Sequence, residues 1–287
     1  MTREIDLVVG AGGKVGAALA GALRRQGATV VTTGRAGSVA SDVTFDLDKP
    51  DYAILPENVA RAYICAAMPG ADACAADPEK AFRVNVTTPV ELTRRLAARG
   101  AFVVNISSTQ IFDGNRPAVS PGTQHSPYSE YGRHKSALEE RLRTLPGTPG
   151  AIVRISKILS PNDPGILSKW RDELAQGRAV SAFRDRAMSP VSLRQAVDAL
   201  VAVAYGRWSG VSQVSASDEI SYLDAALAVA RIARANPELV RSVSADDAVG
   251  TVPPRHAGLD CDATETRLGW RFARSVQVVK EALGAEQ

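Results

Sequence analysis

Tyr131 and Lys135 could act together in acid–base chemistry, because they lie four residues apart in a stretch that reads as a helix. Residues at this spacing share one helix face. A tyrosine has a pKa of about 10 and is a poor acid or base near neutrality, but a neighbouring ammonium favours the phenolate and lowers that pKa. The pair is therefore a candidate for moving a proton at a substrate oxygen. Both residue types suit amphipathic helices, so the spacing alone also occurs without any chemistry.

Ser108 is a third candidate, at the end of the apolar run 102–107. This run predicts a buried β-strand, and doubly wound sheets bind their ligands beyond the carboxyl ends of the strands. We therefore expect Ser108 to hold a substrate oxygen beside Tyr131. The alternative is a strand end whose hydroxyl groups bond only to nearby backbone.

A glycine-rich turn, Gly10-Ala11-Gly12-Gly13-Lys14-Val15-Gly16, joins a predicted strand at 6–9 to a predicted helix at 15–26. Glycine permits a tight turn and a close approach of the backbone to a pyrophosphate, and the helix N-terminus attracts negative charge. The same pattern occurs in ordinary turns of chains rich in Gly and Ala. Its position at the first strand-to-helix junction favours a dinucleotide site, and its place upstream of Ser108 and Tyr131 strengthens all three signals.

The second predicted strand, 28–33, indicates which dinucleotide is bound. NAD-binding proteins usually place a carboxylate at the end of this strand, whereas here Gly34 and Arg35 follow it. Arg35 could pair with a 2′-phosphate, which favours NADP(H) over NAD(H), although solvated loop arginines are common. Asp46 could accept a hydrogen bond from the adenine amino group or cap a turn. The expected cofactor-binding residues are Gly10, Gly12, Gly13, Lys14, Val15, Gly16, Arg35, Asp46, Leu47, Ala66, Ala67, Asn85, Tyr131 and Lys135.

The elements that must position these residues alternate between strands and helices, which predicts an α/β fold with a Rossmann-type doubly wound parallel sheet. A smaller C-terminal substrate-binding lobe is expected, because the regular alternation weakens after residue 155. We assign 1–155 and 188–217 to the nucleotide-binding domain, and 156–187 and 218–287 to the interleaved lobe. Further strands are predicted at 43–45, 62–66, 102–107, 151–155 and 211–215, and further helices at 78–99, 129–144, 166–177, 192–206, 221–235 and 275–283.

The composition argues against several other classes of protein. A formal charge of +3 over 287 residues is too small and too evenly spread for a nucleic-acid partner. The three cysteines and three histidines show no metal-ligand spacing, so no metal site is expected. The longest apolar run, 199–205, is too short to cross a membrane, and the first residues do not read as a signal peptide. We expect a cytoplasmic protein with a small-molecule substrate, and a homodimer is compatible with the sequence.

Several segments follow the pattern of a known family. Residues 106–114 look like I-S-T-D-Y-V-F-D-G, residues 127–135 match P-x-N-x-Y-G-x-x-K, and Leu268-Gly269-Trp270 is similar to L-G-W near the end of the chain. The sequence thus resembles, over nearly its whole length, the dTDP-4-dehydrorhamnose reductase family of the extended short-chain dehydrogenase/reductase superfamily. The resemblance implies a nicotinamide cofactor and a nucleotide-sugar ligand, with Ser108, Tyr131 and Lys135 as catalytic residues. It also implies that Asn85 supports Lys135 through water, while the alternative is a buried amide that bonds to backbone.

Two departures from the family pattern affect the substrate. Thr109 and Gln110 replace an Asp-Tyr pair, and Arg255 follows Pro253-Pro254 where the family has its arginine earlier. The expected substrate-binding residues are Ser108, Thr109, Gln110 and Arg255. The resemblance implies hydride transfer from NADPH to the 4-keto group of a nucleotide-linked deoxysugar. The alternatives are an NAD-dependent nucleotide-sugar epimerase or dehydratase, and a non-catalytic NADP-binding regulatory subunit.

Overall fold

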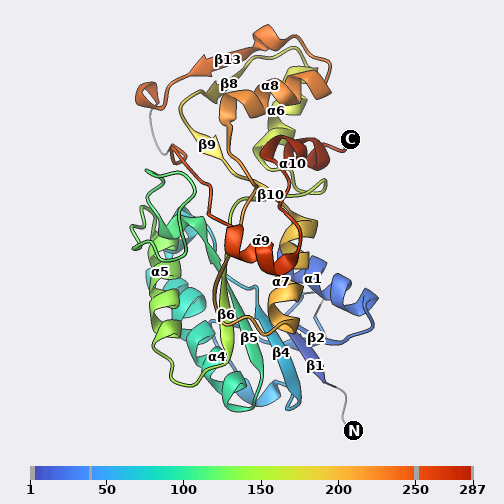
Figure 1. Ribbon diagram of the computed structural model, residues 1–287, viewed down its shortest axis with the longest axis vertical. Coiled ribbons are helices and arrows are strands. Elements are labelled where there is room, and N and C mark those ends of the chain that lie inside the picture. The colour runs from blue at the N-terminus through green and yellow to red at the C-terminus, as the bar shows by residue number, and fades with distance from the viewer. Residues whose placement is uncertain (1–3, 39–40, 249–251, 286–287) are drawn as a thin grey trace. The chain divides into compact units, whose positions relative to one another are not determined.

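The computed structural model describes residues 4–38, 41–248 and 252–285 (Figure 1). The chain forms two compact units. The first comprises Met1–Phe112, Gln124–Arg154 and Val197–Ser212, and the second comprises Asp113–Thr123, Ile155–Ala196 and Gln213–Gln287. No helix in the described ranges is both long and apolar enough to cross a lipid bilayer.

A seven-stranded sheet forms the centre of the first unit, in the order β11-β6-β5-β4-β1-β2-β3. Strands β1 to β5 pair in parallel: β1 with β2 and β4, β2 with β3, and β4 with β5. The order reverses between β1 and β4, which is the point where doubly wound sheets bind their ligands. This architecture confirms the predicted Rossmann-type α/β fold. The strands are β1 (Ile5–Val9), β2 (Thr29–Gly34), β3 (Val43–Thr44), β4 (Val59–Ile64), β5 (Phe102–Ser108), β6 (Gly150–Ile155) and β11 (Gly210–Val214).

Helices cover both faces of the sheet because its strands are apolar on both sides. Figure 1 shows α4 and α5 on one side of the strands and α1 on the other. On α1, Leu19 and Leu23 are fully buried, and each contributes roughly 1.5–3 kcal/mol of burial free energy. The helices are α1 (Lys14–Arg25), α2 (Ala71–Ala76), α3 (Pro78–Phe82), α4 (Thr88–Ala98), α5 (Glu130–Arg143) and α7 (Leu193–Tyr205), with short helical turns η1 (Tyr52–Ile54) and η3 (Thr109–Ile111).

The helix predicted at 78–99 is interrupted by a π-helical turn, η2 (Arg83–Thr87), between α3 and α4. Such turns are rare and frequently lie at functional sites. The strand predicted at 62–66 is also displaced, since β4 covers Val59–Ile64. The chain leaves the strand at Cys65 and Ala66, whose N–H groups both donate to the carbonyl of Val9 at 3.0 Å.

The second unit packs α6, α8 and α10 around its own apolar core, which includes Leu167, Trp170 and Val229, and α9 lies outside this core. The helices are α6 (Ile166–Ala175), α8 (Tyr222–Ile232), α9 (Asp262–Leu268) and α10 (Ser275–Ala282). Short strands pair as β7 (Ile158–Leu159) with β10 (Val191–Ser192), β8 (Val180–Phe183) with β13 (Val240–Val243), and β9 (Ala187–Met188) with β12 (Ile220–Ser221). The turns η4 (Pro237–Leu239) and η5 (Ala245–Asp247) complete it.

Segment 113–123 belongs to this second unit, although it lies within the range assigned above to the nucleotide-binding domain. Backbone contacts explain this membership. The carbonyl of Gly114 accepts from His256 N at 2.9 Å, and Val119 forms a parallel bridge with Leu259. Segment 188–196, also predicted in the first domain, lies in the second unit with β10 paired to β7.

Candidate active site

The glycine turn brings the end of β1 against the loop after β4. Gly10 has φ +93°, and a Cβ there would lie 2.6 Å from the Cβ of Ala66. A Cβ on Gly16 would collide with the carbonyl oxygen of Gly10. Gly13 is the N-cap of α1 and supplies no side-chain cap. The turn therefore requires glycine at positions 10 and 16, and it leaves backbone N–H groups at the start of α1, as phosphate binding requires.

Two neighbouring strand ends adjoin this turn. The carbonyl of Thr33, at the end of β2, accepts from the N–H groups of Gly10 and Ala11 at 3.0 and 2.9 Å. Ala66 and Ala67 follow β4 and are half-buried. The predicted cofactor-binding segments 10–16, 33–35 and 66–67 therefore lie together at the carboxyl edge of the sheet.

Arg35 is exposed directly after β2, and the structure gives its guanidinium no ion-pair partner among the described residues. The hydroxyl of Ser38 lies over the same edge, since a Cβ on Gly12 or Gly34 would lie 2.9 or 2.8 Å from Ser38 Oγ. Asp46 Oδ1 accepts from Asp48 N at 2.9 Å, so this carboxylate caps a turn. Leu47 is buried, and its carbonyl accepts from Thr88 Oγ1 at 2.7 Å.

Tyr131 and Lys135 lie in the first turns of α5. Ser129 caps this helix by accepting from Gly132 N at 3.0 Å. Lys135 is only 4% exposed, and its Nζ donates to the carbonyl of Ile106 at 2.8 Å. The same nitrogen lies 5.6 Å from the centroid of the Tyr131 ring. The carbonyl of β5 thus fixes the ammonium beside the phenol.

Burial governs the pKa values of both side chains. It lowers the pKa of Lys135 from 10.5 to about 8, although the charge of Glu139 acts in the opposite direction. Burial raises the pKa of Tyr131, and Cys74 adds to this effect. The expectation that Lys135 lowers the pKa of Tyr131 is wrong for this structure, because desolvation of the phenolate raises that pKa. Tyr131 is therefore held in its protonated form at neutral pH.

Ser108 ends β5 and begins the turn η3, where its Oγ accepts from Gln110 N at 3.2 Å. This turn contacts the start of α5. The Ser129 hydroxyl donates to Gln110 Oε1 at 2.7 Å, and a Cβ on Gly132 would collide with the carbonyl oxygen of Gln110. The predicted residues Ser108, Thr109 and Gln110 are half-buried and lie next to the helix turn that carries Tyr131.

Asn85 lies fully buried in the π-helical turn η2. Its Oδ1 accepts from Met68 N at 2.8 Å and its Nδ2 donates to Met68 O at 3.0 Å. This is the geometry of the alternative interpretation, a buried amide that bonds to backbone. Nδ2 also lies 3.3 Å from Nδ1 of His134, which sequence reasoning did not single out. The one available signal was the position of His134 directly before Lys135 in the motif.

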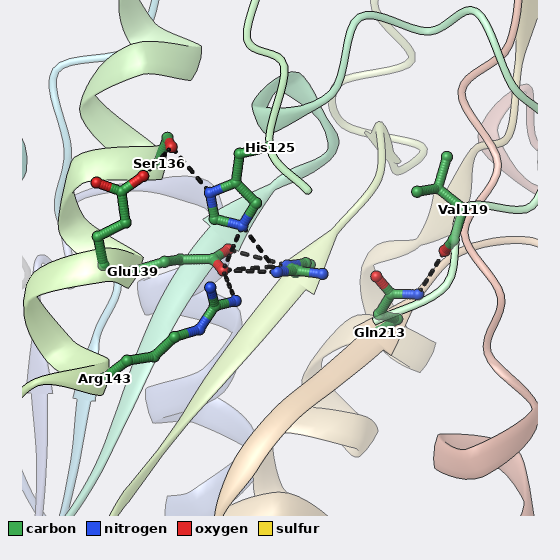
Figure 2. Close-up of polar contacts among 8 residues, drawn as sticks. Val119, His125, Ser136, Glu139, Arg143 and Gln213 are labelled. Atoms are coloured by element: carbon green, nitrogen blue, oxygen red, sulfur yellow. Dashed lines mark hydrogen bonds and ion pairs between the residues drawn. The ribbon is translucent and has the colours of Figure 1, made fainter. Parts of the chain in front are cut away.

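A buried ionic cluster anchors the second half of α5. Glu139 and Arg154 are both fully buried, and Arg154 Nη2 donates to Glu139 Oε2 at 2.7 Å. Figure 2 shows His125 and Arg143 turned toward the same carboxylate, at 3.3 and 2.9 Å. Burial alone would raise the pKa of Glu139, but hydrogen bonds from His125 and Arg154 lower it to about 2. The helix is thereby fixed to β6 through Arg154.

Arg255, the predicted substrate-binding arginine, is exposed in the second unit. The adjacent His256 is held by Glu219, whose Oε2 lies 2.8 Å from His256 Nδ1. Within the described residues, no group of three or more His, Cys, Asp or Glu side chains is arranged to hold a metal ion.

Comparisons of sequence relate the chain to sugar-nucleotide enzymes. Residues 5–286 match the family described as RmlD substrate binding domain. The chain is 28% identical over 281 residues to the "Probable low-salt glycan biosynthesis reductase" of Haloferax volcanii, with 91% of each chain covered. It is 28% identical over 254 residues to dTDP-4-dehydrorhamnose reductase of Mycolicibacterium smegmatis, covering 84% of this chain and 72% of that one. Methionine adenosyltransferase 2 subunit beta of Rattus norvegicus is 25% identical over 222 residues, and the match spans only 63% of its length.

Solved structures share the fold. The dTDP-4-dehydrorhamnose reductase of Bacillus anthracis, solved in complex with NADP, superposes with a TM-score of 0.81 at 17% identity, covering 99% of this chain and 100% of that one. MoeE5, solved with UDP-glucose and NAD, superposes with a TM-score of 0.79 at 20% identity, with 98% of each chain covered.

Proposed function

Since the chain belongs to the RmlD substrate binding domain family, within the extended short-chain dehydrogenases/reductases, we propose that it is an NADPH-dependent reductase of the 4-keto group of a nucleotide-linked deoxysugar. The chain is an NAD(P)-dependent oxidoreductase of the short-chain dehydrogenase/reductase type. The observation that carries the proposal is the position of Tyr131 and Lys135 at the start of α5, against the turn of Ser108.

The proposed chemistry assigns one role to each of these residues. The chemistry that a nicotinamide cofactor would supply here, when bound, is a hydride for the carbonyl carbon. Tyr131 gives its phenolic proton to the carbonyl oxygen, and Ser108 orients that oxygen by a hydrogen bond. The raised pKa of Tyr131 keeps the proton on the phenol before the transfer but opposes its release, so the proposed reaction needs a group that stabilises the phenolate as the proton leaves. Lys135 presents an ammonium near the ring at 5.6 Å and stabilises the phenolate that the transfer leaves behind.

NADPH is the preferred cofactor in this proposal. Arg35 is exposed beside the Ser38 hydroxyl, and neither is a carboxylate that would repel a 2′-phosphate. One similar structure was solved with NADP and another with NAD, so the family fold accommodates both. Titration of the protein with NADPH and NADH measures the preference, and tighter binding of NADH would contradict it. The Arg35→Ala variant should lose affinity for NADPH by about tenfold while its affinity for NADH stays unchanged.

The substrate class is proposed from the family. The exact sugar is to be identified by assaying a panel of nucleotide-linked keto-sugars. Thr109 and Gln110 differ from the residues of the family pattern, so dTDP-4-dehydrorhamnose is only the first compound to assay. Oxidation of NADPH should then be followed with other dTDP-, UDP- and GDP-linked keto-sugars. Arg255 is proposed to contact the diphosphate of the nucleotide sugar.

The proposed place of the reaction is the cytoplasm. The three cysteines are free thiols, which agrees with a reducing compartment.

The Tyr131→Phe variant tests the reaction type. It should lower kcat by about 10²–10⁴-fold, the usual contribution of a positioned acid, while the Kd for NADPH remains close to that of the wild type. Turnover and NADPH binding are measured on the same preparations. An unchanged kcat would overturn the assignment of Tyr131.

A non-catalytic NADP-binding subunit is the second candidate, favoured by the similarity to methionine adenosyltransferase 2 subunit beta. Such a protein has no need of a buried ammonium at Lys135, whose desolvation opposes folding. NADPH binding without turnover on any member of the keto-sugar panel would establish this alternative. An epimerase or dehydratase would instead be purified with non-exchangeable NAD.

A further inference from the structure

His134 is a buried side chain on α5 that the proposed reaction does not use. It is 3% exposed and lies between Tyr131 and Lys135 in the chain. Its Nδ1 is 3.3 Å from Asn85 Nδ2, and its Nε2 is 3.3 Å from Glu130 Oε1. The ring meets Phe82 edge-on, with centroids 5.6 Å apart. Both ring nitrogens therefore have a polar neighbour inside an otherwise closed environment.

The backbone of Met68 fixes the orientation of the Asn85 amide. The amide oxygen accepts from Met68 N at 2.8 Å and one amide hydrogen is donated to Met68 O at 3.0 Å. A flipped amide would lose both bonds. The second amide hydrogen has two acceptors, His134 Nδ1 at 3.3 Å and Cys74 Sγ at 3.8 Å. The shorter contact and the stronger acceptor favour His134 Nδ1, which must be unprotonated to accept it. The ring proton then lies on Nε2, toward Glu130.

We propose that His134 is a positioning residue, which completes the hydrogen bonds of Asn85 and so holds the loop 65–68 against the helix of Tyr131 and Lys135. The inference rests on the proposed function in one respect, since loop 65–68 carries the expected cofactor residues Ala66 and Ala67. Ala66 also packs on Gly10 of the glycine turn. A change at His134 therefore reaches the cofactor site through two hydrogen-bonded groups, without contact between His134 and the cofactor.

The charges around His134 support a neutral ring. Burial lowers its pKa below 6.5, Glu130 acts in the opposite direction, and Arg133 and Lys135 add to the lowering. From the other elements, Asn85 of η2 and the Phe82 ring of α3 face it, Cys74 of α2 lies near the same amide at 3.8 Å, and Arg141 stacks on Phe82. Protonation would set an Nδ1–H against the Asn85 N–H, so the network holds only while the ring is neutral.

A matched pair of variants tests the inference on the full chain. His134→Asn keeps an acceptor oxygen at the position of Nδ1, whereas His134→Gln moves its amide to the position of Nε2. His134→Leu removes both. The Kd for NADPH should stay within about twofold in the Asn variant and rise about tenfold in the Gln and Leu variants, the effect of one lost buried hydrogen bond. With a reducible keto-sugar, the same two variants should lower kcat more than they raise KM for the sugar.

The pH profile gives a readout that a purely structural role would not move. As the pH falls through the lowered pKa of His134, the affinity for NADPH should weaken more in the wild type than in the Asn variant. The 2′-phosphate of NADPH titrates equally in both proteins, so the difference between them reports on His134. Equal affinities in the Leu variant and the wild type would overturn the inference, as would an Asn variant as weak as the Leu variant.

Two measurements without any cofactor test the hydrogen bonds that join His134, Asn85 and Met68. NMR of the histidine ring nitrogens should show His134 as the neutral Nε2–H tautomer, and the Met68 amide should exchange slowly in the wild type and the Asn variant but faster in the Leu variant. The opposite tautomer, or Met68 exchange that is equal in all variants, would overturn the inference. A wild type that binds no NADPH but passes both NMR tests would instead overturn the proposed function.

Discussion

Lys135 and Glu139 lie one turn apart on α5, and both are buried, but the protein treats their charges in opposite ways. Lys135 has the carbonyl of Ile106 as its hydrogen-bond acceptor, and burial lowers its pKa to about 8. Glu139 is surrounded by Arg154, His125 and Arg143, and its pKa is lowered to about 2. The first group is displaced toward its neutral form and the second is stabilised in its charged form.

The difference separates the part of the helix that carries the candidate chemistry from the part that anchors it. Perturbed pKa values concentrate at functional sites, where a side chain is kept in an environment that does not fully stabilise its charge. The Glu139 cluster shows that the same helix can stabilise a buried charge when the neighbouring elements supply partners. The pKa of Lys135 is lowered by burial despite the Ile106 carbonyl and the charge of Glu139, and this is thus a local property of the site.

The largest expected effect comes from removing Arg154, the closest ion-pair partner of Glu139. Arg154→Met leaves the Glu139 carboxylate buried without its closest partner, and should lower the free energy of unfolding by about 3–5 kcal/mol. Urea denaturation measures this. The matched control is the double variant Arg154→Met with Glu139→Leu, which removes both charges and should recover most of the loss. If the free energy of unfolding of the single variant lay within 1 kcal/mol of the wild type, the partners of Glu139 would not stabilise its charge as the comparison with Lys135 requires.

Removing the ammonium of Lys135 should change the free energy of unfolding in the opposite direction. Lys135→Met should abolish turnover but raise the free energy of unfolding by roughly 1–3 kcal/mol at pH 7, because no ammonium is then desolvated. The wild type carries the full burial cost below pH 8 and loses it between pH 8 and 10.5, where the unfolded lysine still binds a proton that the folded one has released. The difference between the two proteins should therefore vanish above pH 10.5. A Met variant that is less stable than the wild type at pH 7 would contradict the comparison.

The smallest effect is expected at the rim of the Glu139 cluster. The Arg143 side chain is 44% exposed although it bonds to the buried carboxylate at 2.9 Å. Arg143→Ala should cost only about 0.2–1 kcal/mol, as exposed ion pairs usually do, and the cost should shrink at high salt. Thermal unfolding at low and high salt measures both. A loss of stability as large as that of Arg154→Met would mean that the exposure of the arginine does not determine how much its ion pair with Glu139 contributes.

The parts of the fold that could be predicted from the sequence are those set by local pattern. Apolar strands alternating with helices predicted the Rossmann-type sheet, and the glycine turn was predicted from a motif in which Gly10 and Gly16 leave no room for a side chain. The two-residue strands β7, β9, β10 and β12 were not predicted, because so short a segment has no period of its own and, unlike β3, these strands lie outside the regular alternation of the first half of the chain. Their existence depends on pairing partners distant in the chain.

The candidate site divides in the same way. The spacing of Tyr131 and Lys135 predicted a shared helix face, but the pKa of Tyr131 depends on burial by the whole fold, so its direction was predicted wrongly. Asn85 is held by Met68, a backbone partner 17 residues away that no side-chain pattern marks. His134 reads in the sequence as an ordinary position of α5 until the π-helical turn brings Asn85 against it.

The contact between Gly132 and the carbonyl oxygen of Gln110 has a consequence for redesign of the enzyme. No side chain fits at position 132 without moving the backbone of the turn that carries Ser108, so this position should be left out of any mutagenesis library. The side chain of Gln110 also matters for this contact, because its Oε1 accepts at 2.7 Å from the Ser129 hydroxyl, which caps α5. A library at positions 109 and 110 should therefore keep a hydrogen-bond acceptor at position 110, so that the turn of Ser108 stays joined to the cap of α5.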